Sequence, residues 1–277
     1  MPIQPTHEEI AVFLTEDVGT GDITASIIAE SVQARARVVT REAMVLCGRA
    51  WFDAVFSKLS SAVEIEWLFA EGADVAAGSP LCDLTGPARA LLTGERTALN
   101  LLQTLSATAT VARRYANAVA GTDCKILDTR KTLPGLRLAQ KYAVKCGGCL
   151  NHRIGLFDAV LIKENHILAS GSIRAAVNKA RAISSMPVEV EVESLDEFAE
   201  ALEVKPDRIM LDNFSLSDMR MAVELNQGRV ELEASGNISL ENILSVAETG
   251  VDFISIGALT KNLVAIDLSM RIELETE

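Results

Sequence analysis

Six short apolar runs recur through the second half of the chain, with amphipathic stretches of helical period between most of them. Strands that alternate with helices form parallel βα units, so this rhythm predicts a parallel sheet covered by helices. A complete (β/α)8 barrel has eight strands, so six runs predict a shortened or open α/β barrel. The runs are residues 125–127, 159–162, 188–192, 208–211, 230–233 and 253–256.

The first hundred residues follow a different pattern. Thr6 and Glu9 form a capping box ahead of an apolar stretch, which predicts a helix there. Residues 88–119 are also helix-compatible, with a break expected near Thr93 and Gly94. Alternating segments predict short strands that are mostly antiparallel. These segments are residues 34–46, 63–69 and 81–84.

Together the two patterns predict two domains, which suits a length of 277 residues. We expect an N-terminal α+β sandwich domain over 1–107 and a barrel over 108–265, with a tail of about 266–277 packing back on the first domain. The start of the chain lacks a secretory signal, and an odd number of cysteines, five, is typical of a reducing compartment. We therefore expect a cytoplasmic protein.

The charge distribution indicates the class of ligand. The chain carries 26 Lys and Arg against 38 Asp and Glu, which argues against binding to nucleic acid or an anionic membrane. Residues 128–163 nevertheless hold seven Lys or Arg against two Asp, an excess of +5 on an otherwise acidic chain. We expect at least two of Arg137, Lys141 and Lys145 to coat a helix. The remaining basic residues favour a small polyanion as ligand.

Polar or glycine residues follow every predicted barrel strand, where the chemistry of such folds is placed. The loops at 235–239 and 257–258 could bring backbone N–H groups to a phosphate, and Ser239 is expected to cap the helix that follows. Glu189, Glu191 and Glu193 alternate and should share one face, from which one of them and Asp212 could bind Mg²⁺ or sugar hydroxyls. The alternative is that this face meets solvent at a sheet edge.

Several long motifs occur in one order along the chain. They are ERTALN at 95–100, DTRKTLPG at 128–135, KYAV at 141–144, NHR at 151–153, LIKENH at 161–166, LDN at 211–213, EASG at 233–236 and IGALT at 256–260. These motifs resemble quinolinate phosphoribosyltransferase, the carboxylating nicotinate-nucleotide pyrophosphorylase of NAD biosynthesis. The resemblance runs from residues 16–22 to Leu268, nearly the whole chain.

The resemblance implies an enzyme that converts quinolinate and phosphoribosyl pyrophosphate (PRPP), with Mg²⁺, to nicotinate mononucleotide, pyrophosphate and CO₂. It implies a homodimer or hexamer in which the N-terminal domain of one subunit covers the barrel mouth of its neighbour. Arg96 would then reach quinolinate across that interface.

The resemblance also assigns roles to residues of the barrel. The two ring carboxylates would be held by Arg130, His152, Arg153 and Lys163. The pyrophosphate would lie near Lys131, and the ribose hydroxyls and the metal would bind Glu191 and Asp212. The 5′-phosphate would bind Ser235, Gly236, Asn237 and Gly257. The residues expected to be catalytic are Lys131, Lys163, Glu191 and Asp212.

The chain departs from the family pattern at three places. Cys149 and Leu150 stand where a third glycine usually precedes the NHR motif, Glu164 replaces an Asp, and Asn237 replaces a second Gly. Asn tolerates positive φ better than most residues, so we expect the loop at Asn237 to keep its conformation.

Some of these residues also allow other interpretations of the function. Cys146, Cys149 and His152 have a spacing that could bind zinc, but a fourth ligand is missing and incidental cysteines are favoured. Lys163 could form a Schiff base as in an aldolase. A molybdate-associated relative of the same fold is the closest alternative, against which the intact 128–132 and 151–153 motifs argue. A lipoyl-carrier module would need a Lys within 60–86, where there is none.

Overall fold

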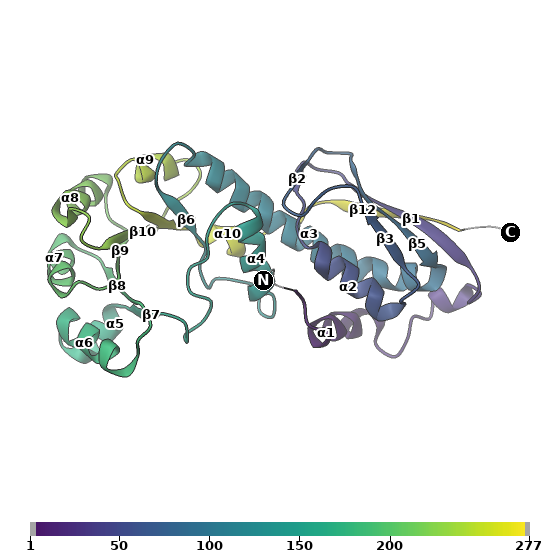
Figure 1. Cartoon of the computed structure of the whole chain (residues 1–277), viewed down its shortest axis with the longest axis horizontal. Coiled ribbons are helices and arrows are strands. Elements are labelled where there is room, and N and C mark those ends of the chain that lie inside the picture. Colours follow the sequence, from purple (N-terminus) through teal and green to yellow (C-terminus); the bar gives the residue numbers. More distant parts are fainter. Residues whose placement is uncertain (1–3, 275–277) are drawn as a thin grey trace. The chain divides into compact units, whose positions relative to one another are not determined.

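The computed structural model describes residues 4–274 and forms two compact units (Figure 1). The first unit contains the chain up to residue 113, the segment 138–147 and the chain from residue 263. The second unit contains 114–137 and 148–262. Each unit has its own sheet.

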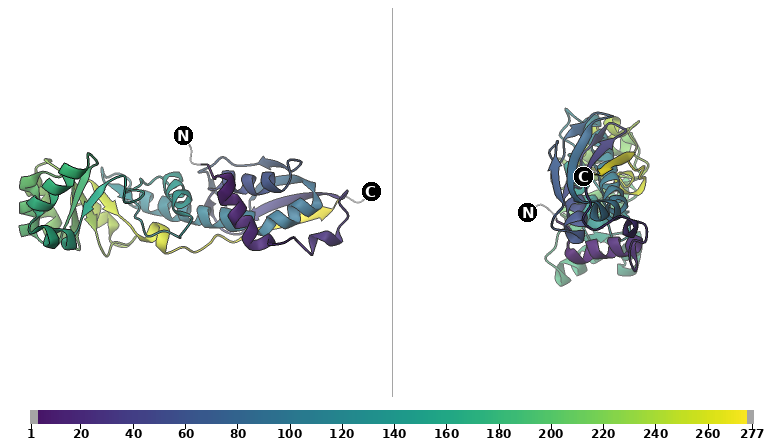
Figure 2. Two further views of the ribbon diagram at one scale, coloured as in Figure 1. Left: turned by 90° about the horizontal axis from the view of Figure 1, so that it is seen from below. Right: turned by 90° about the vertical axis from the view of Figure 1, so that its right-hand side faces the viewer.

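The sheet of the first unit is antiparallel and has the strand order β12-β1-β5-β3. Strand β1 alternates along its length, so that Ala34, Ala36, Val38 and Thr40 are buried and the residues between them face outward. The C-terminal strand β12, yellow in Figures 1 and 2, pairs with β1. A two-stranded sheet, β2 and β4, lies in the same unit. The bounds are β1 (Gln33–Thr40), β2 (Met44–Val45), β3 (Glu64–Trp67), β4 (Asp74–Val75), β5 (Pro80–Pro87) and β12 (Leu268–Leu274).

The expected capping box at the start of helix α1 (His7–Val18) is confirmed, because the N–H of Glu9 donates to Oγ1 of Thr6 over 3.1 Å and the N–H of Thr6 donates to Glu9 over 2.7 Å. A 3₁₀ turn, η1 (Ala25–Ile27), and helix α2 (Arg49–Leu59) follow later in the chain.

Helix α3 (Ala88–Ala118) runs without interruption, so the expected break near Thr93 and Gly94 is wrong. The hydroxyl of Thr93 donates to Asp22 over 2.9 Å, and a Cβ on Gly94 would come within 2.7 Å of the Phe56 ring. The absence of a side chain at Gly94 allows the Phe56 ring to pack closely against the helix, and the glycine does not end the helix.

Helix α4 (Arg137–Cys146) contradicts the expectation that at least two of its three basic residues coat its surface. Lys141 is only 1% exposed, whereas Lys145 is exposed and Arg137 is partly buried. The guanidinium of Arg137 donates to Thr132 and to the carbonyl of Ile154. The basic residues of this helix therefore do not form a solvated coat, apart from Lys145.

The second unit is built on six parallel strands in the order β6-β11-β10-β9-β8-β7. Within the described residues β6 and β7 are its edges, so the barrel is open, as the sequence predicts. Helices α6 (Ile173–Ile183), α7 (Leu195–Val204) and α8 (Leu216–Asn226) lie along one side of this sheet (Figure 1). The strands are β6 (Lys125–Leu127), β7 (Val160–Ile162), β8 (Val188–Val192), β9 (Arg208–Asp212), β10 (Glu231–Ser235) and β11 (Phe253–Ser255).

Serine caps begin three of the helices after the strands. The hydroxyls of Ser172, Ser194 and Ser215 each accept a backbone N–H in the first turn of the helix, as N-caps do. The helices of this unit are α5 (Glu164–Ser170), α6 (Ile173–Ile183), α7 (Leu195–Val204), α8 (Leu216–Asn226), α9 (Ile243–Ala247) and α10 (Ala258–Lys261). Across both units, no helix in residues 4–274 is long and apolar enough to cross a membrane.

Candidate active site

A pocket of about 470 Å³ lies at the carboxyl ends of the barrel strands, entirely within the second unit. Eight of the residues expected from the sequence line it, and they are Arg130, Lys131, His152, Arg153, Lys163, Glu191, Asp212 and Ser235. Glu233, Met210 and Ser255 also line it. Gly236 and Asn237 directly follow Ser235, and Gly257 packs against Lys131. Arg96 does not line this pocket; it lies on α3 in the first unit with an exposed side chain.

Asp128 positions the segment that carries His152 and Arg153. Its side chain is fully buried and accepts the backbone N–H of His152 over 2.8 Å and the side-chain amide of Asn151 over 2.7 Å. The N–H of Leu150 donates to Ile126 over 2.8 Å, so the segment continues along the edge of β6. An aspartate expected only as part of a motif therefore orients the basic residues of the pocket.

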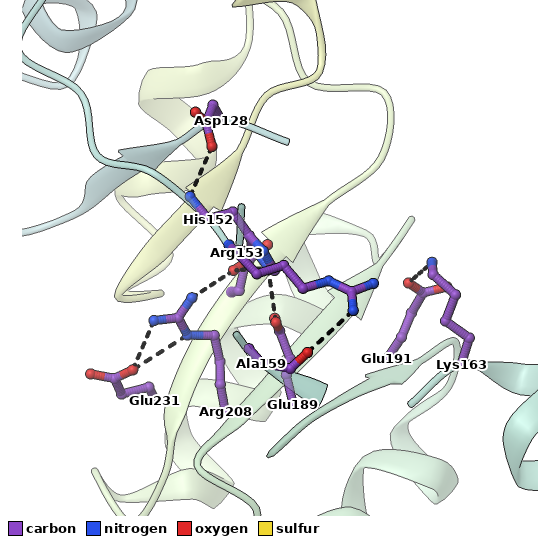
Figure 3. A network of polar contacts seen from close by, with 10 residues as sticks. Asp128, His152, Arg153, Ala159, Lys163, Glu189, Glu191, Arg208 and Glu231 are labelled. Carbon is purple, nitrogen blue, oxygen red and sulfur yellow. Dashed lines mark hydrogen bonds and ion pairs between the residues drawn. The ribbon is translucent and has the colours of Figure 1, made fainter. Parts of the chain in front are cut away.

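A buried ionic network lies beside this segment (Figure 3). Nε2 of His152 is 2.8 Å from Glu189 and 3.6 Å from Glu233. Arg208 contacts Glu233 over 3.0 Å and Glu231 over 3.0 Å, and its guanidinium lies 4.0 Å from the centre of the Phe253 ring. Two buried carboxylates, Glu189 and Glu233, are thus held by an imidazole and a guanidinium.

The pKa of Glu233 is raised to about 7 by its burial, with the charge of Glu189 as the next cause. For His152, burial lowers the pKa, but the hydrogen bond to Glu189 and the charge of Glu233 raise it more, so that the net shift is upward. The N–H of Arg153 opposes this rise, because it donates over 2.8 Å to Nδ1 of His152, which can accept only when unprotonated.

The solvent-facing alternative for the three alternating glutamates is wrong for Glu189, which is 7% exposed on β8, a strand paired on both sides. Glu191 ends the same strand and pairs with Lys163 at the end of β7. Glu193 lies beyond the end of β8 and is exposed. The expectation of one shared face therefore holds for the first two glutamates only.

Sequence reasoning gave no role to Arg208 or Glu233. Arg208 opens an apolar run, and Glu233 alternates with Glu231 along a strand that is otherwise buried. A charge on the inner face of a buried strand is costly unless it is paired, and this is the signal that could have found both residues.

Carboxylates lie at the carboxyl ends of the neighbouring strands β8 and β9, where Glu191 and Asp212 both line the pocket. Asp212 accepts the side-chain amide of Asn213 over 2.8 Å. Such hard oxygen donors suit Mg²⁺, which usually takes one or two protein carboxylates and completes its shell with water and substrate phosphate. The residues present therefore fit the expected metal.

The loop after β10 is tightly packed. Gly236 has φ +92°, and a Cβ there would lie 2.2 Å from the side-chain oxygen of Asn213. Asn237 has φ +51° and donates to the same oxygen over 3.0 Å. Asn237 does adopt the positive φ expected of the glycine it replaces.

The loops after β10 and β11 lead into very short helices. The expectation that Ser239 caps a helix is wrong, because α9 begins at Ile243. Helices α9 and α10 have five and four residues, so any phosphate here would depend on loop N–H groups more than on a helix dipole. A Cβ on Gly257 would lie 3.1 Å from the Lys131 side chain, so the missing side chain leaves room for that lysine.

Cys146, Cys149 and His152 do not form a metal cluster in the described residues. Cys146 groups with Cys47 and Glu71, whereas His152 groups with Glu189 and Glu233. The zinc interpretation of this sequence motif is therefore not supported by the geometry.

An open α/β barrel with basic side chains and two carboxylates at its strand ends has the form of an enzyme site for a small anionic substrate. Family models agree with this class: the model of the quinolinate phosphoribosyl transferase C-terminal domain matches residues 108–271, and that of the N-terminal domain matches 22–106. The chain belongs to the quinolinate phosphoribosyl transferase family.

Individual relatives are similar over nearly their whole length. The chain is 40% identical to a probable carboxylating nicotinate-nucleotide pyrophosphorylase of Bacillus subtilis, over 96% of this chain and 92% of that protein. It is 42% identical to the corresponding Synechocystis protein, over 94% and 90%. The solved nicotinate-nucleotide pyrophosphorylase of Francisella tularensis is 47% identical, covers 98% of both chains and superimposes with a TM-score of 0.93.

Proposed function

We propose that the protein is a decarboxylating quinolinate phosphoribosyltransferase, a pentosyltransferase that converts quinolinate and PRPP to nicotinate mononucleotide, pyrophosphate and CO₂. One observation carries the proposal: a chain of net charge -12 gathers Arg130, His152, Arg153 and Lys163 around a single pocket. A ligand with two carboxylates and several phosphates matches that concentration of basic groups. The names of the relatives point to the same reaction.

In this proposal Arg130, Arg153 and Lys163 hold the two ring carboxylates of quinolinate. Guanidinium groups bind carboxylates in a bidentate way, which also fixes the orientation of the ring. Nε2 of His152 lies 2.8 Å from Glu189 and Nδ1 accepts the N–H of Arg153, so His152 would line the pocket and position Arg153. Ser235, Gly236, Asn237 and Gly257 hold the 5′-phosphate of PRPP.

The chemistry then requires positioning and charge neutralisation. The bond between C1′ and the pyrophosphate oxygen breaks while the quinolinate nitrogen bonds to C1′, and Lys131 stabilises the departing charge. The ring nitrogen is now cationic, so the bond to the 2-carboxylate can break, CO₂ leaves, and the ring carbon takes a proton from solvent. Orientation of this kind can contribute about 7–11 kcal/mol to lowering the barrier.

Glu191 and Asp212 would hold Mg²⁺ together with the ribose hydroxyls. When bound, the metal supplies positive charge to the pyrophosphate leaving group. Lys163 pairs with Glu191, so a cation at Glu191 would free that lysine for the quinolinate carboxylate. This exchange couples occupation of the two halves of the pocket.

We further propose that the protein works in the cytoplasm as a homodimer or hexamer, with Arg96 of one subunit completing the site of another. Support comes from the exposure of Arg96 within the ERTALN motif, which gives this side chain no evident role inside its own unit.

The test is a mass-spectrometric end-point assay with quinolinate, PRPP and Mg²⁺, and nicotinate in place of quinolinate in a parallel reaction. Nicotinate mononucleotide from quinolinate alone supports the decarboxylating reaction and the clamp on two carboxylates. Product from nicotinate, or no product from folded protein, contradicts the proposal.

A further inference from the structure

The first unit holds a second cluster of chemically reactive side chains. One ligand atom each of Cys47, Glu71 and Cys146 lie within 4.8 Å of one another. The three residues come from segments far apart in the sequence: Cys47 lies just before α2, Glu71 lies between β3 and β4, and Cys146 ends α4. All three belong to the first unit, apart from the pocket of the barrel.

Hydrogen bonds hold Cys47 and Glu71 in place. Cys47 is fully buried, and both its N–H and its carbonyl bond to the hydroxyl of Ser106, over 3.1 and 3.0 Å. The Glu71 carboxylate accepts the N–H of Gly48 over 2.7 Å and that of Arg49 over 3.3 Å. Each carboxylate oxygen keeps a further lone pair, so Glu71 is oriented and still able to bind a cation.

Cys146 is anchored through its backbone and approached by two donors. Its carbonyl accepts Nη2 of Arg113 over 3.2 Å. The thiol of Cys47 and the hydroxyl of Tyr142 both lie close to its sulfur and lower the pKa of its thiol, with Cys47 as the larger cause. The Cys146 side chain is half-buried, whereas Cys47 is buried, and neither forms a disulfide.

We propose that Cys47, Glu71 and Cys146 form a binding site for Zn²⁺ or a similar thiophilic divalent cation. Two thiolates and a carboxylate are a donor set that Zn²⁺ accepts, and the Tyr142 hydroxyl or a water completes a tetrahedron. Binding releases the two thiol protons to solvent. The cation offsets two of the three negative charges of the two thiolates and the Glu71 carboxylate, and Arg113 lies near enough to reduce the rest.

A cation here would add side-chain bonds between three segments that are already joined by the hydrogen bonds of Glu71 and Arg113. We expect it to stabilise the first unit by an amount that grows with the logarithm of its concentration over its Kd, as any ligand that binds only the native state does. The site is independent of the proposed transferase reaction, so failure of one leaves the other standing.

The experiment titrates the reduced full-length protein with Cd²⁺ and follows the ultraviolet thiolate-to-metal band, with Zn²⁺ competing. The expected result is one equivalent of Cd²⁺ bound per chain, with the absorbance of two thiolate ligands in the ultraviolet band. Cys146→Ser should lose much of the band and weaken binding at least tenfold. Cys149→Ser is the matched control and should bind like the parent, because Cys149 is a buried cysteine of the second unit.

A second measurement needs no variant. Zn²⁺ should protect Cys146 from alkylation by iodoacetamide, as mapped by peptide mass spectrometry on the parent protein. The proposal is overturned if Cd²⁺ produces no thiolate band, or if Cys149→Ser abolishes the band while Cys146→Ser leaves it intact. A Cys47–Cys146 disulfide under peroxide, in protein that binds no Cd²⁺, would identify a redox pair and also overturn it.

Discussion

Nε2 of His152 lies 2.8 Å from Oε2 of Glu189, and both side chains are at least nine-tenths buried. This contact joins the NHR segment beside β6 to strand β8, which lies four strands away in the sheet, across the inner face of the open barrel. His152 also lines the pocket, whereas Glu189 lies behind it. A buried acid therefore controls the orientation of a residue that lines the pocket.

The first prediction concerns the carboxylate clamp, by which we mean the basic side chains Arg130 and Arg153 that are proposed to bind the ring carboxylates of quinolinate. Arg130→Ala or Arg153→Ala should lower kcat/KM by more than tenfold, about 1.4 kcal/mol or more, because each removes a charged donor for a ring carboxylate. Steady-state kinetics with quinolinate as the varied substrate measure the effect. Arg220→Ala, at an exposed position of α8, is the control. Parent-like kinetics in both clamp variants would refute the assignment.

The role of Arg96 can be tested by subunit complementation. Arg96→Ala and Lys163→Ala should each be inactive alone. If the interface is isologous and Arg96 is donated across it, mixing the two after dissociation should restore about a quarter of the sites of a dimer. A mixture as inactive as its components would mean that both residues act within one subunit.

Stability should depend on pH through Glu233. Its pKa rises from 4.5 to about 7 in the folded protein, so the native state holds a proton that the unfolded chain has lost. The stability from this group is therefore present below about pH 4.5 and is lost as the pH rises through 7. His152, whose pKa is also raised, contributes with the same sign.

The measurement is Tm by circular dichroism between pH 5 and 8. Fluorescence is unsuitable, because both tryptophans, Trp51 and Trp67, lie in the first unit. The parent Tm should fall as the pH rises, and Glu233→Gln, which stays neutral, should flatten the curve. An unchanged slope in Glu233→Gln would exclude this carboxyl as the source.

Replacement of Arg208, the first residue of β9, should lower the stability of the barrel unit. Arg208→Met should destabilise the barrel unit by about 3 kcal/mol, because removing the guanidinium from a buried ion pair leaves Glu233 with only the more distant His152 as an ionic partner. Hydrogen exchange of the β9 and β10 amides reports on this unit. Adding Glu233→Met should recover part of the loss, and a double variant less stable than Arg208→Met would argue against the pair.

The loop at Asn237 offers a test of backbone conformation. Asn237→Gly accepts the φ of +51° and loses one exposed hydrogen bond, so its KM for PRPP should stay close to that of the parent. Asn237→Val should raise that KM by about tenfold, since positive φ costs a β-branched residue about 1–2 kcal/mol. Equal KM values in the two variants would contradict a phosphate role for this loop.

The sequence by itself determined the local structure. The capping box of Thr6 and Glu9 and the six barrel strands follow from propensity, periodicity and caps, which depend on residues close in the chain. The rule that parallel strands present their carboxyl ends at one edge is enough to bring six of the eight expected pocket residues together, whereas His152 and Arg153 are expected there from the family resemblance.

The tertiary structure decided what depends on contacts between distant residues. Gly94 continues a helix because Phe56 packs against it, and Glu233 is held by Arg208 from the neighbouring strand. Cys146 groups with Cys47 and Glu71, which come from distant parts of the chain, and not with the other members of its own sequence motif, Cys149 and His152. Local patterns carry no information on which buried charges or thiols meet, because that choice depends on how separate elements pack together.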